Sequence, residues 1–191
     1  MDERYKLFLE NLIFSILSKY GESIYSMVVY GSFATETAGS GSDLDLLIHL
    51  KNGVEKEKIA DLNKILFELE SKYEIEVAWT LRVPFLRQIH PPIMIFEYND
   101  LNWRKIYFNN PHLRWTIALS NASKNIFFQN IKKTGQVVYG ENVLDHIQVS
   151  IRLKDKIFSS LMYPIYRLGK STSKLVYTTF FRNNIYSPKT Q

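Results

Sequence analysis

The chain has 191 residues, which suits one domain with or without a smaller helical companion. Its 46% hydrophobic residues are enough to build a core, and the absence of cysteine excludes a disulfide scaffold, a cysteine nucleophile and a thiolate metal site. Because no apolar run has the length of a membrane span and the first residues lack a signal-peptide layout, we expect a cytoplasmic protein.

The net charge of +5 is unevenly distributed along the chain. Residues 1–100 contain 10 Lys and Arg against 16 Asp and Glu, a balance of −6, whereas residues 101–191 contain 14 against 3, a balance of +11. An acidic half suits divalent cations, and a basic half attracts polyanions such as nucleic acid or nucleotide phosphates. Chance segregation of solvated charges would give the same pattern.

Two helices and two strands are predicted within the first 73 residues. Apolar residues three and four apart predict amphipathic helices over residues 2–19 and 56–73. Short apolar runs rich in strand formers predict strands over residues 27–30 and 43–50, the first of which ends at a Gly-Ser turn.

A third strand is predicted over residues 73–81, where apolar and polar side chains alternate. Glu74 and Glu76 share the polar face of this strand, and residues 93–98 predict a further strand. Arg82, just after the third strand, is a candidate for contact with phosphates.

The second half of the chain reads as helical and basic, with the boundary near residue 100. A helix is predicted to run to about residue 133, followed by an extended link over 135–140 and a helix over 143–163 that Pro164 ends or kinks. We therefore expect a core over residues 1–100 and a basic helical region over residues 101–191. Its aromatic residues suit base stacking, and they suit the packed face of ordinary helices equally well.

The most informative stretch is residues 31–45, GSFATETAGSGSDLD. A strand that ends in Gly31-Ser32 leads into a tight turn and a helical start, where free backbone amides bind phosphate. Asp43 and Asp45 lie two apart on a strand, so their carboxylates point to the same face. Two neighbouring carboxylates repel unless a cation lies between them, and Mg²⁺ binds through one or two carboxylates plus substrate phosphates. The stretch therefore predicts a nucleoside triphosphate site with a metal, although a buried turn with two solvent-facing aspartates is the alternative.

This stretch resembles the signature of the DNA polymerase β-like nucleotidyltransferase superfamily, and of its small members in particular. That signature is Gly-Ser, ten residues and then Asp-x-Asp, often with Ser before the first Asp; Gly31, Ser32, Ser42, Asp43 and Asp45 fall at its positions. The resemblance implies an α/β (α+β) fold, in which a polymerase-β-like core with a small mixed sheet precedes a helical C-terminal region.

The resemblance also implies the roles of individual residues. Asp43 and Asp45 would bridge two Mg²⁺ (or Mn²⁺) ions, and Gly31, Ser32 and Ser42 would belong to the nucleotide-binding loop. A third carboxylate would complete the metal site and help to deprotonate the acceptor hydroxyl. Glu76, between two apolar residues, fits that position better than Glu74, although both would also suit the wet face of an edge strand.

The implied function is a metal-dependent nucleotidyltransferase that moves a nucleoside monophosphate from an NTP to a hydroxyl of a protein, an RNA end or a small molecule. The basic C-terminal half favours a protein or RNA acceptor. Glu36 departs from the family pattern, because an acid beside the phosphate loop would weaken triphosphate binding unless it points outward. The alternative is a catalytically silent nucleotide- or RNA-binding protein, or one that neutralises a toxin by binding alone, on the same fold.

Overall fold

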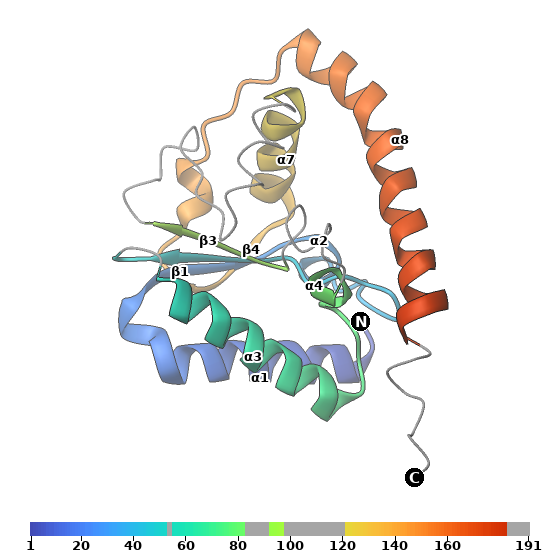
Figure 1. The fold of residues 1–191 in the computed structure, drawn as a ribbon. Helices are drawn as coiled ribbons and strands as arrows, with labels where there is room; N and C mark the ends of the chain where they lie inside the picture. Colours follow the sequence, from blue (N-terminus) through green and yellow to red (C-terminus); the bar gives the residue numbers. More distant parts are fainter. Residues whose placement is uncertain (53–54, 83–91, 98–120, 183–191) are drawn as a thin grey trace.

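A four-stranded mixed sheet between layers of helices forms the body of the molecule (Figure 1). The computed structural model describes residues 1–52, 55–82, 92–97 and 121–182. The longer elements are, in chain order, α1 (Glu3–Tyr20), β1 (Ile24–Val29), β2 (Leu46–Leu50), α3 (Lys56–Tyr73), β3 (Ile93–Glu97), α7 (Asn121–Thr134), β4 (Gln136–Gly140) and α8 (Leu153–Val176). The shorter ones are η1 (Gly21–Ser23), α2 (Gly31–Ala34), α4 (Trp79–Arg82), η3 (Val143–His146) and the π-helical turn η4 (Tyr177–Arg182). The predicted α/β class is confirmed.

The strand order of the sheet is β3-β2-β1-β4. β1 pairs antiparallel with both β2 and β4, whereas β2 and β3 run parallel. Every residue of β2 is buried, as expected of a central strand covered on both faces. The burial includes His49, whose pKa is lowered to about 4 because desolvation disfavours its charged form.

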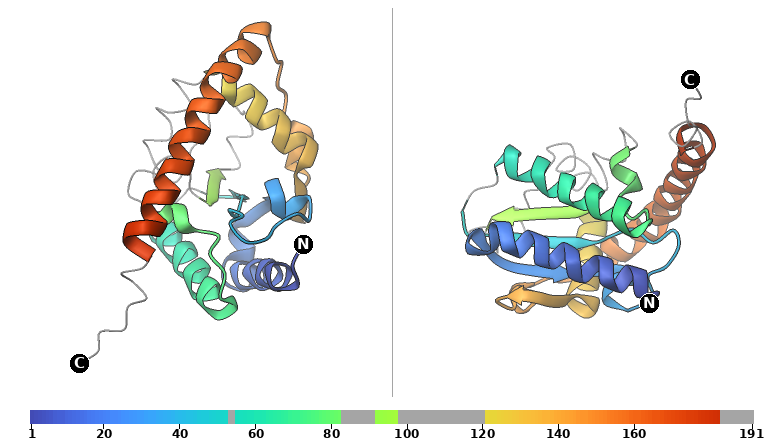
Figure 2. Two further views of the ribbon diagram at one scale, coloured as in Figure 1. Left: turned by 90° about the vertical axis from the view of Figure 1, so that its right-hand side faces the viewer. Right: turned by 90° about the horizontal axis from the view of Figure 1, so that it is seen from below.

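Helices α1 and α3 lie side by side across one face of the sheet (Figure 2). α1 buries residues three or four positions apart, which gives it one apolar stripe, and Asp2 caps its first turn by accepting from Arg4 N–H at 3.0 Å. On the opposite face, α7 and η3 pack side chains such as Phe128, Ile131 and Val143 against the sheet. The sheet is therefore buried on both sides.

Helix α8 extends beside this body, and its C-terminal end reaches α4 and the loop that follows α2 (Figures 1 and 2). Pro164 lies inside α8 at an exposed position, so the helix does not end at Pro164, one of the two outcomes predicted for it. Proline has no N–H to donate to the helix carbonyl four residues earlier, and at an exposed position water can hydrate that carbonyl. None of the helices in the described ranges is long and apolar enough to cross a membrane.

The predicted third strand over residues 73–81 is wrong. Glu74 ends α3 in the left-handed conformation with φ 53°, and α4 begins at Trp79. Between them, the N–H groups of Val77 and Ala78 donate to the buried carboxylate of Glu70. Because the Glu70 carboxylate accepts the hydrogen bonds of these two N–H groups, they are not available to pair with a neighbouring strand.

The helices over residues 3–20 and 56–73 and the strand that begins at residue 93 agree with the predictions. β1 and β2 overlap the strands predicted over 27–30 and 43–50, but β1 begins three residues earlier and β2 three residues later than predicted. The predicted link over 135–140 is strand β4, so the sheet takes one strand from the stretch assigned to the C-terminal region. The predicted helix over 143–163 is instead the turn η3 followed by α8. The helix predicted to run to about residue 133 corresponds at its end to α7, and the part of that prediction before residue 121 lies outside the described residues.

Candidate functional site

The Gly-Ser turn and the second aspartate meet at the ends of β1 and β2. Tyr30 N–H donates to the Asp45 carbonyl at 3.0 Å, which places Gly31 beside the Asp45 side chain. Gly31 has φ +67°, and a Cβ at this position would collide with the Asp45 carboxylate. Only glycine combines that backbone conformation with so close an approach. The two halves of the predicted motif are thus in contact.

The turn after Gly31 is held by its own hydrogen bonds. Thr37 N–H donates to the Ser32 carbonyl at 2.9 Å, and the Thr35 hydroxyl donates to the Gly31 carbonyl at 3.2 Å. Gln136 of β4 donates to the Ala34 carbonyl at 2.5 Å and ties the turn to the sheet. The side chain of Glu36 is exposed to solvent, where its charge is screened.

Ser42 closes the loop that precedes the aspartates. Its hydroxyl oxygen accepts from Gly39 N–H at 3.0 Å, while its own N–H donates to the Gly39 carbonyl at 2.9 Å. The structure therefore places Ser42 as the residue that fixes the shape of the loop directly before Asp43.

Asp43 and Asp45 flank a buried leucine just before β2, rather than lying within the strand as predicted. Leu44 is 0% exposed, whereas both aspartates are partly exposed, so the two carboxylates lie on the side opposite the core. The indole N–H of Trp79 donates to the Asp43 carboxylate. This contact joins the aspartates to α4.

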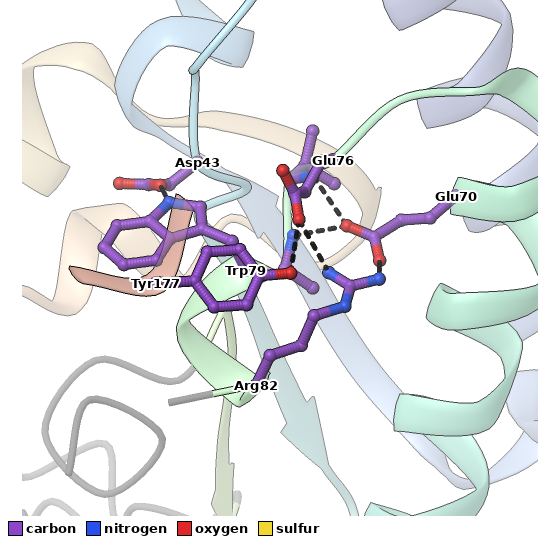
Figure 3. A network of polar contacts seen from close by, with 8 residues as sticks. Asp43, Glu70, Glu76, Trp79, Arg82 and Tyr177 are labelled. Carbon is purple, nitrogen blue, oxygen red and sulfur yellow. Dashed lines mark hydrogen bonds and ion pairs between the residues drawn. The ribbon is translucent and has the colours of Figure 1, made fainter. Parts of the chain in front are cut away.

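Glu76 lies on the neighbouring segment, which the Leu44 N–H connects to the aspartates by donating to the Val77 carbonyl at 3.1 Å. Figure 3 shows the Glu76 carboxylate between Tyr177 and Arg82. Tyr177 of η4 donates its hydroxyl to Glu76 Oε1 at 2.8 Å, and Arg82 Nη1 lies 3.7 Å from the same oxygen. The other candidate, Glu74, is exposed at the end of α3 and lies outside the contacts drawn in Figure 3.

Glu70 organises this side of the site, and the sequence reading missed it. Its carboxylate is 2% exposed and accepts from two backbone N–H groups and from Arg82 Nη2 at 2.7 Å (Figure 3). Burial acts to lower the pKa of Arg82, but Glu70 above all, together with Tyr177 and Glu76, outweighs burial and the pKa lies above its usual value. Arg82 is therefore engaged by carboxylates. A signal existed, because Glu70 follows Leu62 and Leu66 at four-residue spacing on the buried stripe of α3.

Helix α8 brings a second cation to the site. Lys174 Nζ donates to the Gly41 carbonyl at 3.1 Å and lies 5.3 Å from the centre of the Trp79 ring. The rings of Trp79 and Tyr177 also pack together, with centroids 6.3 Å apart. No local pattern in the sequence indicates these contacts, since they join residues far apart in the chain.

The sequence predicts a metal held by Asp43, Asp45 and Glu76. Within the described part of the chain, no three Asp, Glu or His side chains gather closely enough to hold a metal ion. The Glu76 carboxylate accepts from Tyr177 and lies 3.7 Å from Arg82 Nη1, and its role as a third metal ligand beside Asp43 and Asp45 stays a prediction. Asp43 and Asp45 still offer the hard oxygen donors that suit Mg²⁺ together with substrate phosphates.

The sequence matches one protein family over most of its length. Residues 10–141 match the family described as "Nucleotidyltransferase domain". A curated relative, "Putative protein adenylyltransferase MJ1305" of Methanocaldococcus jannaschii, is 32% identical over 104 residues, which cover 49% of this chain and 67% of the relative.

Solved structures resemble the chain more remotely. A spectinomycin adenyltransferase from Enterococcus faecialis, crystallised with ATP and spectinomycin, is 14% identical with a TM-score of 0.41, and the match covers 76% of this chain and 60% of that one. A toxin-antitoxin structure with AMP-PNP is 12% identical with a TM-score of 0.37, and the match covers 88% of this chain and 95% of that one.

Proposed function

The chain belongs to the nucleotidyltransferase domain family, and we propose that it moves a nucleoside monophosphate from an NTP to a hydroxyl group. The observation that carries the proposal is the contact between Gly31 and the Asp45 carboxylate. It brings a turn suited to phosphate directly against a carboxylate suited to a cation. A nucleoside triphosphate with its divalent metal requires both at one place.

Gly31 and Ser32 would contact the β- and γ-phosphates, and Ser42 would hold the loop around them. Gly31 lets the phosphates approach the backbone closely, and the Ser32 hydroxyl can donate to a phosphate oxygen. The exposed position of Glu36 supports this arrangement, because a solvated carboxylate repels the triphosphate only weakly.

Asp43 and Asp45 would hold Mg²⁺ at the α-phosphate. When bound there, the metal would neutralise negative charge on the transferred phosphoryl group and on the leaving pyrophosphate. Trp79 fixes the orientation of Asp43 through its indole N–H, which keeps the carboxylate in place before nucleotide enters.

Glu76 would accept the proton of the acceptor hydroxyl. Arg82 orients its carboxylate, and Glu70 in turn positions Arg82. We assign nucleotide binding and catalysis to the core expected over residues 1–100, completed by β4, and the docking of the acceptor molecule to the basic region over residues 101–191. The net charge of +11 in that region suits an acidic protein surface or RNA.

ATP is the proposed donor and a protein hydroxyl the proposed acceptor, because the curated relative is named a protein adenylyltransferase. To test this, the purified chain is incubated with Mg²⁺ and each of the four α-labelled NTPs, with cell extract or total RNA as acceptor. Label from ATP on a protein band is expected, and Asp43→Asn should reduce it by about a hundredfold or more. Asp145→Asn, a change at an exposed aspartate, serves as the control.

The proposed transfer is contradicted if nucleotide stabilises the protein against heat but no band carries label. The chain would then bind nucleotide without catalysis, which is the alternative function on the same fold. The engagement of Glu76 by Arg82 and Tyr177 is the observation that favours this second reading.

A further inference from the structure

The Tyr177 hydroxyl is directed at Glu76, the carboxylate assigned above to accept the proton of the acceptor. The Tyr177 Oη to Glu76 Oε1 distance is 2.8 Å, although the two residues are 101 positions apart in the chain. Tyr177 is 3% exposed and packs on Trp79. A phenylalanine ring at this position would pack on Trp79 equally well. The hydroxyl therefore adds a hydrogen bond to Glu76 that the burial of the ring does not require.

This contact has the arrangement of a nucleophile and its base. An activated hydroxyl nucleophile lies within hydrogen-bond reach of a base, and a third group orients the base. Here the hydroxyl of Tyr177 donates to Glu76, and Arg82 lies 3.7 Å from the accepting oxygen. Glu70 completes the chain of contacts by pairing with Arg82 at 2.7 Å.

The same hydroxyl belongs to the network that contains the first aspartate. Figure 3 shows Tyr177 and Glu76 in one cluster with Trp79 and Asp43. Trp79 packs against the Tyr177 ring and donates its indole N–H to Asp43. Trp79 thus connects the tyrosine that carries this hydroxyl to Asp43, one of the two aspartates proposed to hold Mg²⁺ at the α-phosphate.

We propose that Tyr177 is a self-modification site, at which the chain links a nucleoside monophosphate to its own phenol oxygen. This inference rests on the proposed function. A bond forms between Tyr177 Oη and the α-phosphorus of the NTP, and the bond from that phosphorus to the bridging oxygen breaks. Glu76 takes the phenol proton, and pyrophosphate leaves with the electron pair.

Burial makes the reaction intramolecular. A hydroxyl on a side chain that is 3% exposed cannot enter the site of a second copy, so each molecule modifies itself. The product cannot keep the contact with Glu76, because the phenol oxygen has lost its proton and carries a nucleotide. Modification therefore displaces the end of α8 from the acceptor side and frees Glu76 for another acceptor.

The experiment examines the full chain by mass spectrometry, first as purified and then after incubation with ATP and Mg²⁺. We expect the mass increment of one AMP residue, localised to Tyr177, at a rate per molecule that does not change with protein concentration. Glu76→Gln should slow the labelling by about a hundredfold. Hydrogen exchange at residues 174–178 should rise in the labelled fraction, a readout that does not depend on turnover.

Tyr177→Phe should abolish the increment, whereas Tyr139→Phe, at an exposed tyrosine of β4, should leave it unchanged. Equal labelling of Tyr177→Phe overturns the inference. So does an unlabelled chain that still transfers nucleotide to an acceptor in cell extract, an outcome that leaves the proposed function intact. If the wild type does not label itself and Tyr177→Phe transfers nucleotide to that acceptor faster, Tyr177 blocks the acceptor site and is not itself an acceptor. A chain that labels nothing refutes the proposed function and this inference together.

Discussion

The two sides of the candidate site are built in different ways. The nucleotide side is one continuous stretch, residues 31–45, whose ends meet where Gly31 contacts Asp45. The acceptor side assembles Glu70, Glu76 and Tyr177 from α3, from the segment after it and from η4. The first side depends on local spacing between two paired strands, and the second depends on how distant elements pack.

This difference determines what a substitution should do on each side. On the nucleotide side, the strands fix the backbone independently of the side chains that meet phosphate, so substitutions there should change transfer more than stability. On the acceptor side, polar groups are buried and depend on one another, so removal of one leaves others without compensation. Stability should respond most strongly there.

The largest effect is expected from Glu70→Ala. The change leaves the Val77 and Ala78 N–H groups without their acceptor and Arg82 without its 2.7 Å partner. Removing one partner of a buried ion pair costs about 3 to 5 kcal/mol, and we expect the free energy of unfolding in urea to fall by about 3 kcal/mol, because Arg82 is partly exposed.

The control is Glu68→Ala on the same helix, at a glutamate whose side chain is 64% exposed and pairs loosely with Lys64. Its free energy of unfolding should stay within about 0.5 kcal/mol of the wild type. If the two variants unfold alike, Glu70 does not organise the acceptor side and the contrast between the two sides fails.

A smaller loss of stability but a clear loss of transfer is expected from Gly31→Ala. The left-handed conformation at φ +67° costs a side chain about 1 to 2 kcal/mol, and the new Cβ displaces the Asp45 carboxylate. Transfer measured with α-labelled ATP should fall by about a hundredfold.

Gly39→Ala is the matched control in the same loop, because a Cβ at Gly39 meets nothing within 4 Å. It should retain transfer close to the wild-type rate. Full activity of Gly31→Ala would mean that the contact between the turn and Asp45 has no part in the reaction.

The same contrast explains what the sequence predicted. Helix α3 and the residues of the 31–45 stretch were predictable, because periodicity and motif spacing act over short distances. The loop role of Ser42 and the place of Asp43 and Asp45 just before β2 required the structure, since both depend on the turn that Gly39 and Ser42 form.

The acceptor side was predicted only in part. Glu76 was chosen over Glu74 by its apolar neighbours, and of the two it lies in the network with Tyr177 and Arg82. The strand expected around it is absent because Glu70 takes its backbone donors, a competition that alternation of residue types cannot show. The contribution of α8 depends on packing over long sequence distances, which no local pattern encodes.

Asp155, near the first turn of α8, contacts both the start of the helix and α7. The buried Asp155 carboxylate accepts from Arg152 N–H at 2.7 Å, as in a capping box, and from Asn125 of α7 at 3.2 Å. The first of these contacts is the main reason that the pKa of Asp155 lies below its usual value of 3.8. Asp155 thus joins the start of the helix to α7, far along α8 from Lys174 and Tyr177.

The smallest effect is therefore expected from acid. Because folding lowers the pKa of Asp155, its contribution to stability is present above pH 3.8 and is lost as the pH falls through the folded-state pKa. Hydrogen exchange, corrected for its intrinsic pH dependence, should show α8 losing protection in this range before β1 and β2 do. Asp155→Asn cannot ionise, so its α8 should have low protection already at pH 6 and little further change on acidification. Equal pH dependence of α8 and β1 in the wild type would show that Asp155 does not control the docking of α8.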